Sequence, residues 1–341
     1  LNRYYRIITE ILPKCLKRAD ILRESFRRLG VAIVPDKSDL DRRFYKRKDE
    51  RTVSILIPAH NEEQNIGDLL DDILKQEGEG YVTKKILVYS DNSKDKTNAI
   101  VGGKAKKCSK ISLIEGKERA GKAGALNKLI SKADTDIAVF LDADVRLQYL
   151  NTIEELITPL FSSDSIGLIG GRTQAERVSG FNIVALGSYF SGVILNHIRE
   201  QNPNGIFSAH GRILAMPKAL YKKIKVPDAA GTDQFMFIEC ILNGFEFRFA
   251  PYAVAFFNVP TTFKDYYKQN VRFATSSKMN VVRAQNPQLF EVSNKPKILV
   301  RSFFEHPLCG ISWIVIFFIS KILSVGTKNE SSKWEKVSST K

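Results

Sequence analysis

The amino-acid sequence predicts an α/β fold in which helices cover a central sheet. From Thr52 onward, short β-branched runs alternate with helical apolar periods, as in parallel strands joined by helices. Polar clusters directly follow several of the apolar runs, which is expected where strands of such a sheet end. A chain of 341 residues, 43% hydrophobic and 26% charged, can also bury one large core.

The first predicted elements follow one another in a regular order. Val53–Ile57 is an apolar run that stops at Pro58 and predicts a buried strand. Over residues 66–74, Ile and Leu recur at the spacing of one helix face. Further strands are predicted at 86–89, 111–114 and 137–141, with helices at 95–107 and 124–132 between them. This βαβαβαβ order is typical of doubly wound nucleotide-binding sheets.

The regular alternation weakens beyond Gly171. A mixed region is expected to about residue 283, with shorter strands at 245–249 and 254–257. The sequence therefore divides into a regular first half and a less regular second half.

An uncharged stretch lies near the end of the chain, from Leu308 to Ser320, before Lys321 interrupts it. A spanning helix needs about 20 apolar residues, so the stretch is a short or tilted span, a re-entrant or interfacial helix, or a buried core helix. We favour membrane contact, because the stretch is apolar on all faces and follows the sheet region. The polar tail at 327–341 is expected to be disordered.

Residues 1–51 form a basic lead segment in which Arg and Lys interleave with aliphatic and aromatic residues, interrupted by Pro13. This amphipathic pattern fits a helix packed on the domain with its charged face in water. It fits equally a helix lying on an anionic membrane, where each basic residue contributes about 1 kcal/mol. Both interpretations stay open.

The net charge and the cysteines indicate which partners and which cellular compartment to expect. Lys and Arg number 52 against 37 Asp and Glu, a formal charge of +15, which favours an anionic partner such as phospholipid, nucleotide phosphate or nucleic acid. The four cysteines stand far apart, without zinc-ligand spacing, so neither a disulfide framework nor a structural zinc site is indicated. A reducing compartment, the cytoplasm, is expected.

Acidic residues follow the predicted strands at the edge where ligands of open parallel sheets bind. Asp142 and Asp144 leave a strand of apolar residues and point to the same side, because side-chain direction alternates along a strand. Two such close carboxylates favour a hard cation between them, Mg²⁺ or Mn²⁺, whose coordination substrate phosphates would complete. The alternative is an acidic turn that caps the following segment.

Two further features near this edge have both a functional and a structural interpretation. Lys122 and Gly124 lie in a small-residue turn, Gly121–Asn127, that suits a phosphate but also suits a simple helix start. His210 is a candidate third metal ligand, although a lone histidine is more often a packed residue.

The motifs, taken together, resemble the inverting family-2 glycosyltransferases with the A-type nucleotide-sugar (GT-A) fold. The matching segments, in order, are PAHNEE at 58–63, YSDNSKDKT at 89–97, GKAGALN at 121–127, LDADVRL at 141–147, GTD at 231–233 and QNVRF at 269–273. The last resembles the Gln-x-x-Arg-Trp motif of the membrane-bound synthase branch. The resemblance implies a Rossmann-like GT-A fold, α/β, with a mixed central sheet flanked by helices and terminal membrane-associated helices.

The resemblance also implies roles for individual residues. Asp233 would be the general base, and Asp144 with Asp142 would hold the metal. Nucleotide-sugar contacts would come from the turns at the strand ends and from the basic loop: Pro58, Ala59, Asn61, Glu62, Asp91, Lys122, Gly124, Asp142 and Ala143. Gln269, Arg272 and Phe273 would contact the donor diphosphate and the acceptor. The structural alternative for Asp233 is an N-cap of a helix at 234–242.

Two departures from the family pattern concern the acceptor. Thr232 stands where a glutamate often precedes the aspartate, and Phe273 replaces the tryptophan that stacks on the acceptor sugar in polymerising members. Processive synthesis is therefore not implied. The expected domains are the lead segment 1–51, a catalytic domain 52–285 (donor half 52–150, acceptor half 151–285), a membrane-associated helix region 286–326 and the tail 327–341.

The expected activity is metal-dependent transfer of a glycosyl unit, with inversion, from a nucleotide sugar to a lipid-linked or glycan acceptor at a membrane, with the catalytic domain on the cytoplasmic face. UDP is the first expectation for the nucleotide. A nucleotidyltransferase is the alternative enzyme, but it would need a glycine-rich basic loop after the first strand, where Pro58–Glu63 is acidic. The charge also permits a nucleic-acid-binding module, yet the sequence contains no RNA-recognition or helix-turn-helix pattern. We therefore expect no nucleic-acid partner.

Overall fold

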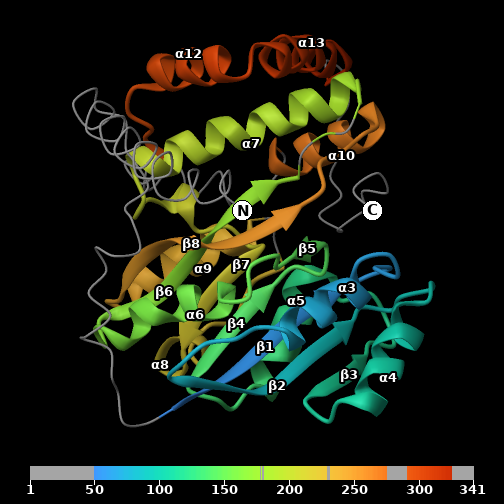
Figure 1. Ribbon diagram of the computed structural model, residues 1–341, viewed down its shortest axis with the longest axis vertical. Helices are drawn as coiled ribbons and strands as arrows, with labels where there is room; N and C mark the ends of the chain where they lie inside the picture. The colour runs from blue at the N-terminus through green and yellow to red at the C-terminus, as the bar shows by residue number, and fades with distance from the viewer. Residues whose placement is uncertain (1–49, 177, 179, 229–230, 275–289, 325–341) are drawn as a thin grey trace, which may run out of the picture. The chain divides into compact units, whose positions relative to one another are not determined.

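The computed structural model describes residues 50–176, 178, 180–228, 231–274 and 290–324 (Figure 1). For residues 270–274 and 321–324 it describes the backbone but not the side chains. The predictions for residues 1–49, 275–285 and 325–341 lie outside the described residues. These include the basic amphipathic segment, the end of the acceptor half and the polar tail.

Eight strands form one sheet in the described part of the chain, in the order β3-β2-β1-β4-β7-β6-β8-β5. The strands are β1 (Arg51–Ala59), β2 (Tyr81–Ser90), β3 (Ile111–Glu115), β4 (Ile137–Leu141), β5 (Val145–Arg146), β6 (Ile166–Ala175), β7 (Ile213–Pro217) and β8 (Glu246–Phe257). The strands predicted at 53–57, 86–89, 111–114 and 137–141 are confirmed as β1 to β4. All four pair in parallel, so their carboxyl ends lie at one edge.

The sheet becomes mixed beyond β4. β7 pairs antiparallel with both β4 and β6, and β6 pairs parallel with β8. The short β5 pairs antiparallel with the end of β8. The central sheet is therefore mixed, as the family resemblance implied.

Helices cover both faces of the sheet, because alternate strand residues point to opposite sides. One face carries Val53, Ile55 and Ile57 of β1 and packs against α3, α4 and α6. The other face carries Leu56 and packs against α5, α8 and α9. The helices are α3 (Ile66–Leu74), α4 (Thr97–Lys107), α5 (Gly121–Lys132), α6 (Thr152–Ile157), α8 (Lys218–Tyr221) and α9 (Thr232–Leu242), with 3-10 turns at Thr158–Phe161 and Ile206–Ser208.

Two features of the second half differ from the sequence prediction. The shorter strands expected at 245–249 and 254–257 are one strand, β8, whose register against β6 shifts between Gly171 and Arg172. The mixed region, for which the sequence analysis named strands, also contains α7 (Ile183–Gln201), a helix of 19 residues. Its N-cap is Asn182, whose side chain accepts hydrogen bonds from the backbone N–H groups of Val184 and Ala185.

α7 lies between the sheet and a pair of helices, α12 (Lys295–Glu305) and α13 (Pro307–Ser324) (Figure 1). The close approach of α7 to α13 depends on Gly187, where an added Cβ would lie 3.0 Å from the backbone Cα and N of Trp313. Phe190 packs nearby against Trp313, with ring centroids 5.9 Å apart. A further helix, α10 (Phe263–Ala274), contributes Tyr266 to an apolar cluster with Val184 of α7 and Ile316 of α13.

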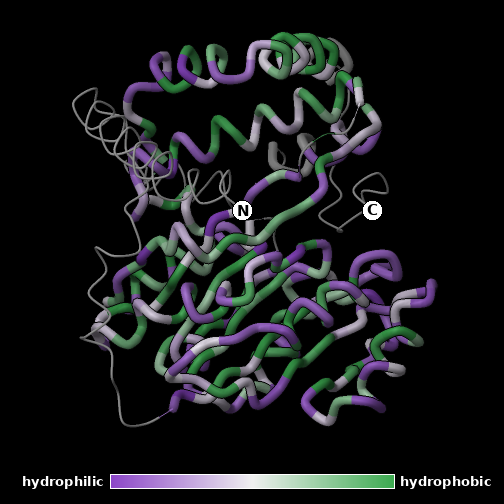
Figure 2. Tube along the Cα trace, in the orientation of Figure 1, coloured by the Kyte–Doolittle hydropathy of each residue, from purple (hydrophilic) through white to green (hydrophobic). Residues whose placement is uncertain are grey.

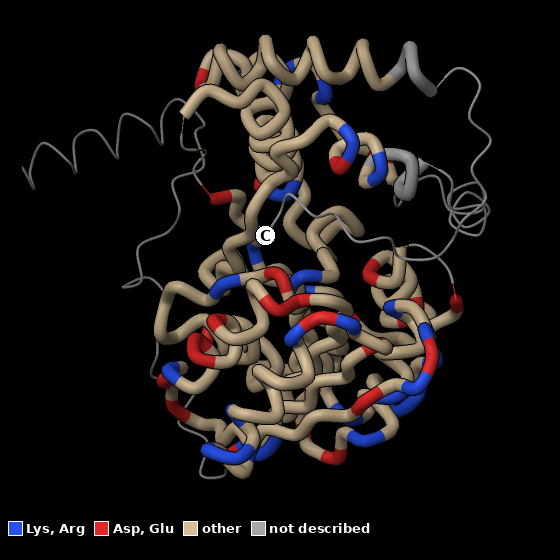
Figure 3. The backbone as a smooth tube through the Cα atoms, turned by 90° about the vertical axis from the view of Figure 1, so that its right-hand side faces the viewer, with Lys and Arg blue, Asp and Glu red and all other residues tan. Residues whose placement is uncertain are grey.

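α13 contains the uncharged stretch noted in the sequence. Figure 2 shows α13 as largely hydrophobic, whereas α12 alternates between hydrophobic and hydrophilic residues. No Lys, Arg, Asp or Glu occurs from Pro307 to Ser320, and α13 lies apart from the charged surface of the sheet domain in Figure 3. In the described ranges, no helix combines the length and the apolar character that crossing a membrane requires.

Candidate active site

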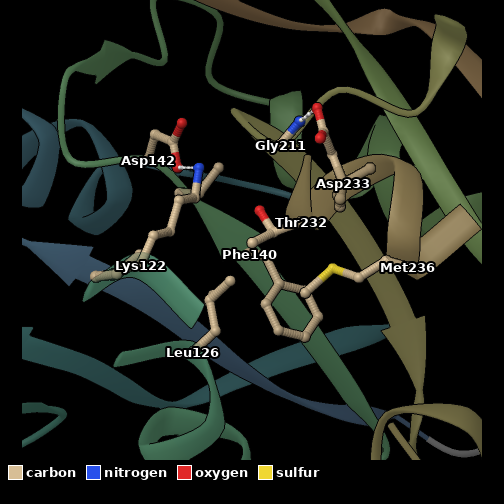
Figure 4. Close-up of a pocket in the computed structure, with 11 residues that line it drawn as sticks. Lys122, Leu126, Phe140, Asp142, Gly211, Thr232, Asp233 and Met236 are labelled. Atoms are coloured by element: carbon tan, nitrogen blue, oxygen red, sulfur yellow. Dashed lines mark hydrogen bonds and ion pairs between the residues drawn. The ribbon is translucent and has the colours of Figure 1, made fainter. Parts of the chain in front are cut away.

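A pocket lies at the carboxyl ends of β1 and β4, where the sequence predicted a ligand site. Asp142 follows β4, Lys122 comes from the first turn of α5, and Asp233 comes from the first turn of α9. Figure 4 shows these polar groups above an apolar floor formed by Leu126, Phe140 and Met236. The pocket is lined by Pro58, Lys122, Leu126, Phe140, Leu141, Asp142, Gly211, Leu214, Thr232, Asp233 and Met236.

Asp142 and Lys122 form an ion pair within this pocket (Figure 4). Burial raises the pKa of Asp142, the Lys122 ammonium opposes that shift, and the neighbouring Asp144 carboxylate adds to it. The backbone N–H of Asp142 donates to the carbonyl oxygen of Arg212 at 3.2 Å, which ties the end of β4 to the turn before β7. The end of β4 thus carries two close acidic groups with one ammonium in place.

The carboxylates of Asp142 and Asp144 fit a hard divalent cation. Oxygen ligands are those that Mg²⁺ and Mn²⁺ prefer, and Mg²⁺ is commonly bound by one or two carboxylates with substrate phosphates completing its coordination. The described residues contain no group of three or more His, Cys, Asp or Glu arranged to hold a metal alone. Two carboxylates alone would leave most coordination positions of such a cation to other ligands.

Asp91, at the end of β2, is fully buried and faces the first turn of α5. Its two carboxylate oxygens accept hydrogen bonds from the backbone N–H groups of Ala120 at 2.7 Å and Gly121 at 3.0 Å. Arg119 Nε lies 3.3 Å from the same carboxylate. Asp91 therefore fixes the helix start that presents Lys122.

His60 and Arg119 complete the wall beside Asp91. His60 Nδ1 lies 2.8 Å from the carbonyl oxygen of Asp91, which can only accept, so Nδ1 carries the proton. Nε2 is then free to accept from Arg119 Nη1 at 2.7 Å and from Asn61 Nδ2 at 3.0 Å. His60 thus ties the turn after β1 to the end of β2.

The remaining predicted nucleotide-site residues after β1 are held by the turn after β2. Asn61 adopts a left-handed conformation with φ of 54°, and its side-chain oxygen accepts the backbone N–H of Lys94 at 2.7 Å. Ala59 and Glu62 are buried, and the backbone N–H of Glu62 donates to Thr97 Oγ1 at 2.7 Å. Gly124 lies within α5, and Ala143 is the second residue after β4. The roles predicted for all these residues remain predictions.

Asp233 lies in the first turn of α9, which begins one residue earlier at Thr232. The N-cap position belongs to Gly231, whose φ of 83° suits glycine, so the alternative that Asp233 is the N-cap is wrong. Asp233 Oδ2 instead accepts the backbone N–H of Gly211 at 3.1 Å (Figure 4). This contact directs the carboxylate into the pocket shared with Lys122 and Asp142.

His210 lies beside cations rather than beside acidic ligands. Arg212 Nη1 is 3.3 Å from His210 Nε2. Burial lowers the pKa of His210 well below its usual value, and the charges of Arg212, Arg199 and Lys122 add to this effect. Both ring nitrogens of His210 face N–H groups of Arg212, and its role as a third metal ligand stays a prediction.

The predicted acceptor residues Gln269, Arg272 and Phe273 lie on α10. The side chains of Arg272 and Phe273 lie outside the described part of the chain. Their predicted contacts with diphosphate and acceptor therefore remain predictions.

Three arginines that sequence reasoning missed lie close to this site. Arg119 contacts Asp91 and His60, as described above. Arg199 on α7 and Arg212 before β7 lie close enough to interact electrostatically with each other. The only sequence signal for Arg199 was a charged residue near the end of an otherwise apolar helical pattern.

The mixed sheet with its acidic strand ends is a nucleotide-sugar-type α/β domain of the GT-A class. The family model described as glycosyl transferase family 2 matches residues 54–224, half of the chain. The chain therefore belongs to glycosyl transferase family 2, and this membership makes it a glycosyltransferase rather than a nucleotidyltransferase or a nucleic-acid-binding module.

Curated relatives share the same region. The chain is 24% identical over 280 residues to a poly-beta-1,6-N-acetyl-D-glucosamine synthase of Staphylococcus aureus, covering 78% of this chain and 63% of that protein. It is 25% identical over 271 residues to the Staphylococcus epidermidis enzyme of that name, covering 77% of this chain and 63% of the relative. The chain thus spans less than two thirds of the length of these relatives.

A solved structure shares the fold. The mannosyltransferase PcManGT from Pyrobaculum calidifontis, described in complex with GDP-Man and Mn²⁺, superposes with a TM-score of 0.54 at 19% identity, covering 81% of this chain and 76% of that chain. At this identity the likeness shows the fold alone.

Proposed function

We propose that the protein transfers a glycosyl unit from a nucleotide sugar, a UDP-sugar, to a glycan or lipid-linked acceptor with inversion at the anomeric carbon. The observation that carries the proposal is that Lys122, Asp142 and Asp233 line one pocket at the carboxyl edge of the sheet. The ammonium of Lys122, for a diphosphate, and the carboxylate of Asp233, for the acceptor, thus face the same space. The synthases of the two staphylococci are named for an N-acetylglucosamine polymer, which supports a hexosamine as a donor sugar to test.

The residues of the chain divide the displacement between them. Asp233 accepts the proton of the acceptor hydroxyl, so that its oxygen can form a bond to the anomeric carbon. The bond from that carbon to the diphosphate breaks, and its electron pair leaves with the diphosphate. Because attack and departure occur on opposite faces, the configuration inverts.

The leaving diphosphate develops negative charge that needs a preorganised partner. Lys122 supplies one positive charge from the first turn of α5, in contact with Asp142. Asp142 and Asp144 would hold Mg²⁺ or Mn²⁺, which neutralises phosphate charge when bound. The Mn²⁺ in the mannosyltransferase structure supports the choice of metal.

Release of nucleoside diphosphate from a panel of nucleotide sugars tests this proposal. The full chain is assayed with Mn²⁺ or Mg²⁺, beside Asp144→Asn and Asp233→Asn. Loss of the base is expected to lower the rate by about 10²- to 10⁴-fold. Asp164→Asn, an exposed carboxylate distant in sequence from all site motifs, is the matched control. Full release by both site variants would reject the assignment.

We also propose that the protein works at a membrane surface through α12 and α13, with the catalytic domain on the cytoplasmic face. Large apolar side chains on these helices are exposed, among them Phe304 at 83%, Leu308 at 67% and Phe318 at 62%. Lys295 and Lys297 at the start of α12 are exposed and complement anionic phospholipid headgroups. The described cysteines, Cys108, Cys240 and Cys309, are free thiols, which supports a reducing compartment.

A further inference from the structure

Arg199 is a buried cation that no carboxylate neutralises within ion-pair distance in the described structure. Its side chain is among the largest that are fully buried, with 1% of the residue exposed. Nε donates to the carbonyl oxygen of Phe207 at 3.0 Å, and Nη1 donates to Thr173 Oγ1 at 2.8 Å and Asn196 Oδ1 at 3.1 Å. All three acceptors are neutral, and Nη2 has no acceptor among the described residues.

Arg212 repeats this pattern from the neighbouring turn. Its guanidinium carbon lies 3.8 Å from the centroid of the Phe257 ring, and its Nε is buried without an acceptor in the described structure. A third guanidinium, that of Arg172 on β6, lies nearby and is paired with Glu200 at 3.5 Å. Three guanidinium groups from β6, α7 and the turn before β7 therefore gather in one place, and two of them lack a carboxylate partner.

Such an arrangement is costly unless an anion binds to it. Burying a charge without a partner carries a large desolvation penalty, and like charges add repulsion. Burial together with the charges of Arg212 and Arg172 lowers the pKa of Arg199 to about 9, while the carboxylate of Asp233 opposes the shift. The described structure thus holds buried guanidinium groups beside Asp233 that an anionic ligand would stabilise.

The arginine cluster adjoins Asp233, because Gly211, which precedes Arg212, donates its backbone N–H to Asp233 Oδ2. The donor diphosphate is assigned to Lys122 and Asp142, whereas the electrostatic neighbours of Arg199 are Arg212, Arg172 and Asp233. Guanidinium groups bind phosphate oxygens in a bidentate fashion, which lysine cannot reproduce. The neutral N-acetylhexosamine units of a glycan would leave these donors without an anion.

We propose that Arg199 and Arg212 form an anion subsite that binds a phosphate group on the acceptor substrate of this glycosyltransferase. The proposal rests on the proposed function and names the chemical class of its acceptor. The phosphate is a recognition group held beside Asp233, and the hydroxyl that attacks the sugar belongs to the same acceptor. The phosphate can belong to a soluble sugar phosphate or to a lipid-linked one.

Binding of inorganic phosphate to the full chain, measured calorimetrically with UDP and Mn²⁺ saturating, tests the proposal. Wild type is expected to bind phosphate while UDP stays bound. Arg212→Met and Arg199→Met are each expected to weaken phosphate binding about tenfold or more, with UDP affinity unchanged. Arg248→Met removes one exposed arginine from β8, paired with Glu246, and is expected to behave as wild type.

Several outcomes would overturn the subsite. Phosphate that is displaced by UDP occupies the donor site instead, and equal affinity in wild type and both arginine variants means that the cluster does not bind it. If Arg199→Met fails to fold, Arg212→Met carries the test, because Arg212 is only half-buried. Wild type that binds UDP but no phosphate rejects the subsite alone, whereas failure to bind UDP rejects the proposed function.

Two phosphate esters distinguish the sources of the phosphate. Glucose 1-phosphate represents a soluble acceptor, and a short-chain isoprenyl phosphate in detergent represents a lipid-linked one. Tighter binding of one ester, lost in Arg212→Met and retained in Arg248→Met, supports the subsite and identifies the source. Binding of neither ester contradicts it.

Discussion

Asp91 shows how a single residue supports both the fold and the proposed donor site. Its carboxylate closes the gap between the end of β2 and the start of α5 by accepting two backbone hydrogen bonds. The first turn of a helix has unpaired N–H groups and a positive dipole end, both of which a carboxylate satisfies. The same turn presents Lys122, so the position of the phosphate-binding ammonium depends on Asp91.

Asp91→Ala is expected to destabilise the protein by about 2 kcal/mol or more, because two buried hydrogen bonds to a charged group are lost. Urea unfolding at neutral pH measures the change. The control is Asp134→Ala, which removes an exposed ion pair to Lys218 and is expected to change the free energy of unfolding much less. Similar losses in the two variants would contradict the role given to Asp91.

Asp136 supplies a pH-dependent contribution to stability at the start of β4. Its Oδ2 accepts the backbone N–H of Thr52 at 2.8 Å and the hydroxyl of Thr52 at 2.7 Å, and the backbone bond above all lowers the pKa of Asp136. A carboxyl whose folded pKa is lowered stabilises the fold above its unfolded pKa of about 3.9. That contribution disappears as the pH falls through the lower, folded pKa.

The free energy of unfolding of Asp136→Asn is therefore expected to fall below that of wild type at pH 7 and to approach it below about pH 4. Urea titrations of both proteins across this range measure the difference. Asp164→Asn should show no such convergence, because Asp164 lies exposed in the loop before β6. A difference that stays constant with pH would show that Asp136 does not act through its charge.

At the residue scale, sequence patterns predicted the acidic strand ends but not the arginines beside them. Asp142 and Asp144 were visible because a charged pair directly after a buried apolar run is unusual. Arg199 was not, because its site is assembled from β6, α7 and the turn before β7, which are distant in sequence. Its burial depends on tertiary contacts that no local pattern contains.

The strands and helices of the first half were predictable because the apolar residues of each recur at a regular spacing. β1 to β4 are short apolar runs, and α3 places its apolar residues on one face. α7 was missed because Gly187, Gly192 and interspersed serines break the helical pattern, and because the helix is buried on opposite sides by the sheet and by α13. β8 was divided into two strands because Pro251 interrupts it at the register shift.

Gly187→Ala tests the packing of α7 on α13. The new Cβ would lie 2.5 Å from Ile316 Cδ1 and 3.0 Å from the Trp313 backbone, so the helices must separate. Overpacking of this kind costs about 1 to 3 kcal/mol, which thermal unfolding measures. Gly103→Ala on α4, whose Cβ would meet nothing within 4 Å, should instead stabilise by up to about 1 kcal/mol. Equal effects would show that the approach is not tight.

At the scale of the whole molecule, the exposed apolar residues of α12 and α13 lie on the side of α7 away from the sheet (Figure 1). The proposed acceptor subsite uses Arg199 of α7, and α7 also packs on α13. The acceptor subsite and the apolar surface are thus joined by one helix.

Replacement of Phe304, Leu308 and Phe318 together by Ser is expected to weaken binding to anionic vesicles at least about tenfold, because each buried apolar side chain contributes about 1.5 to 3 kcal/mol. Vesicle flotation at about 1 M salt measures this apolar contribution, since charge is then screened beyond about 3 Å. Leu242→Ser, an exposed apolar residue on α9, is the control. Unchanged flotation of the triple variant would reject the membrane surface.

The antiparallel pairing of β7 with β4 also has a consequence for folding during synthesis. The strands on the other side of β4 come from one continuous stretch, Arg51–Leu141, which is synthesised before α7. Earlier segments generally fold first during synthesis, so we expect this parallel half to become protease-resistant while the chain is still attached. Ribosome-bound nascent chains would then hold Lys122 and Asp142 in place before they acquire Asp233.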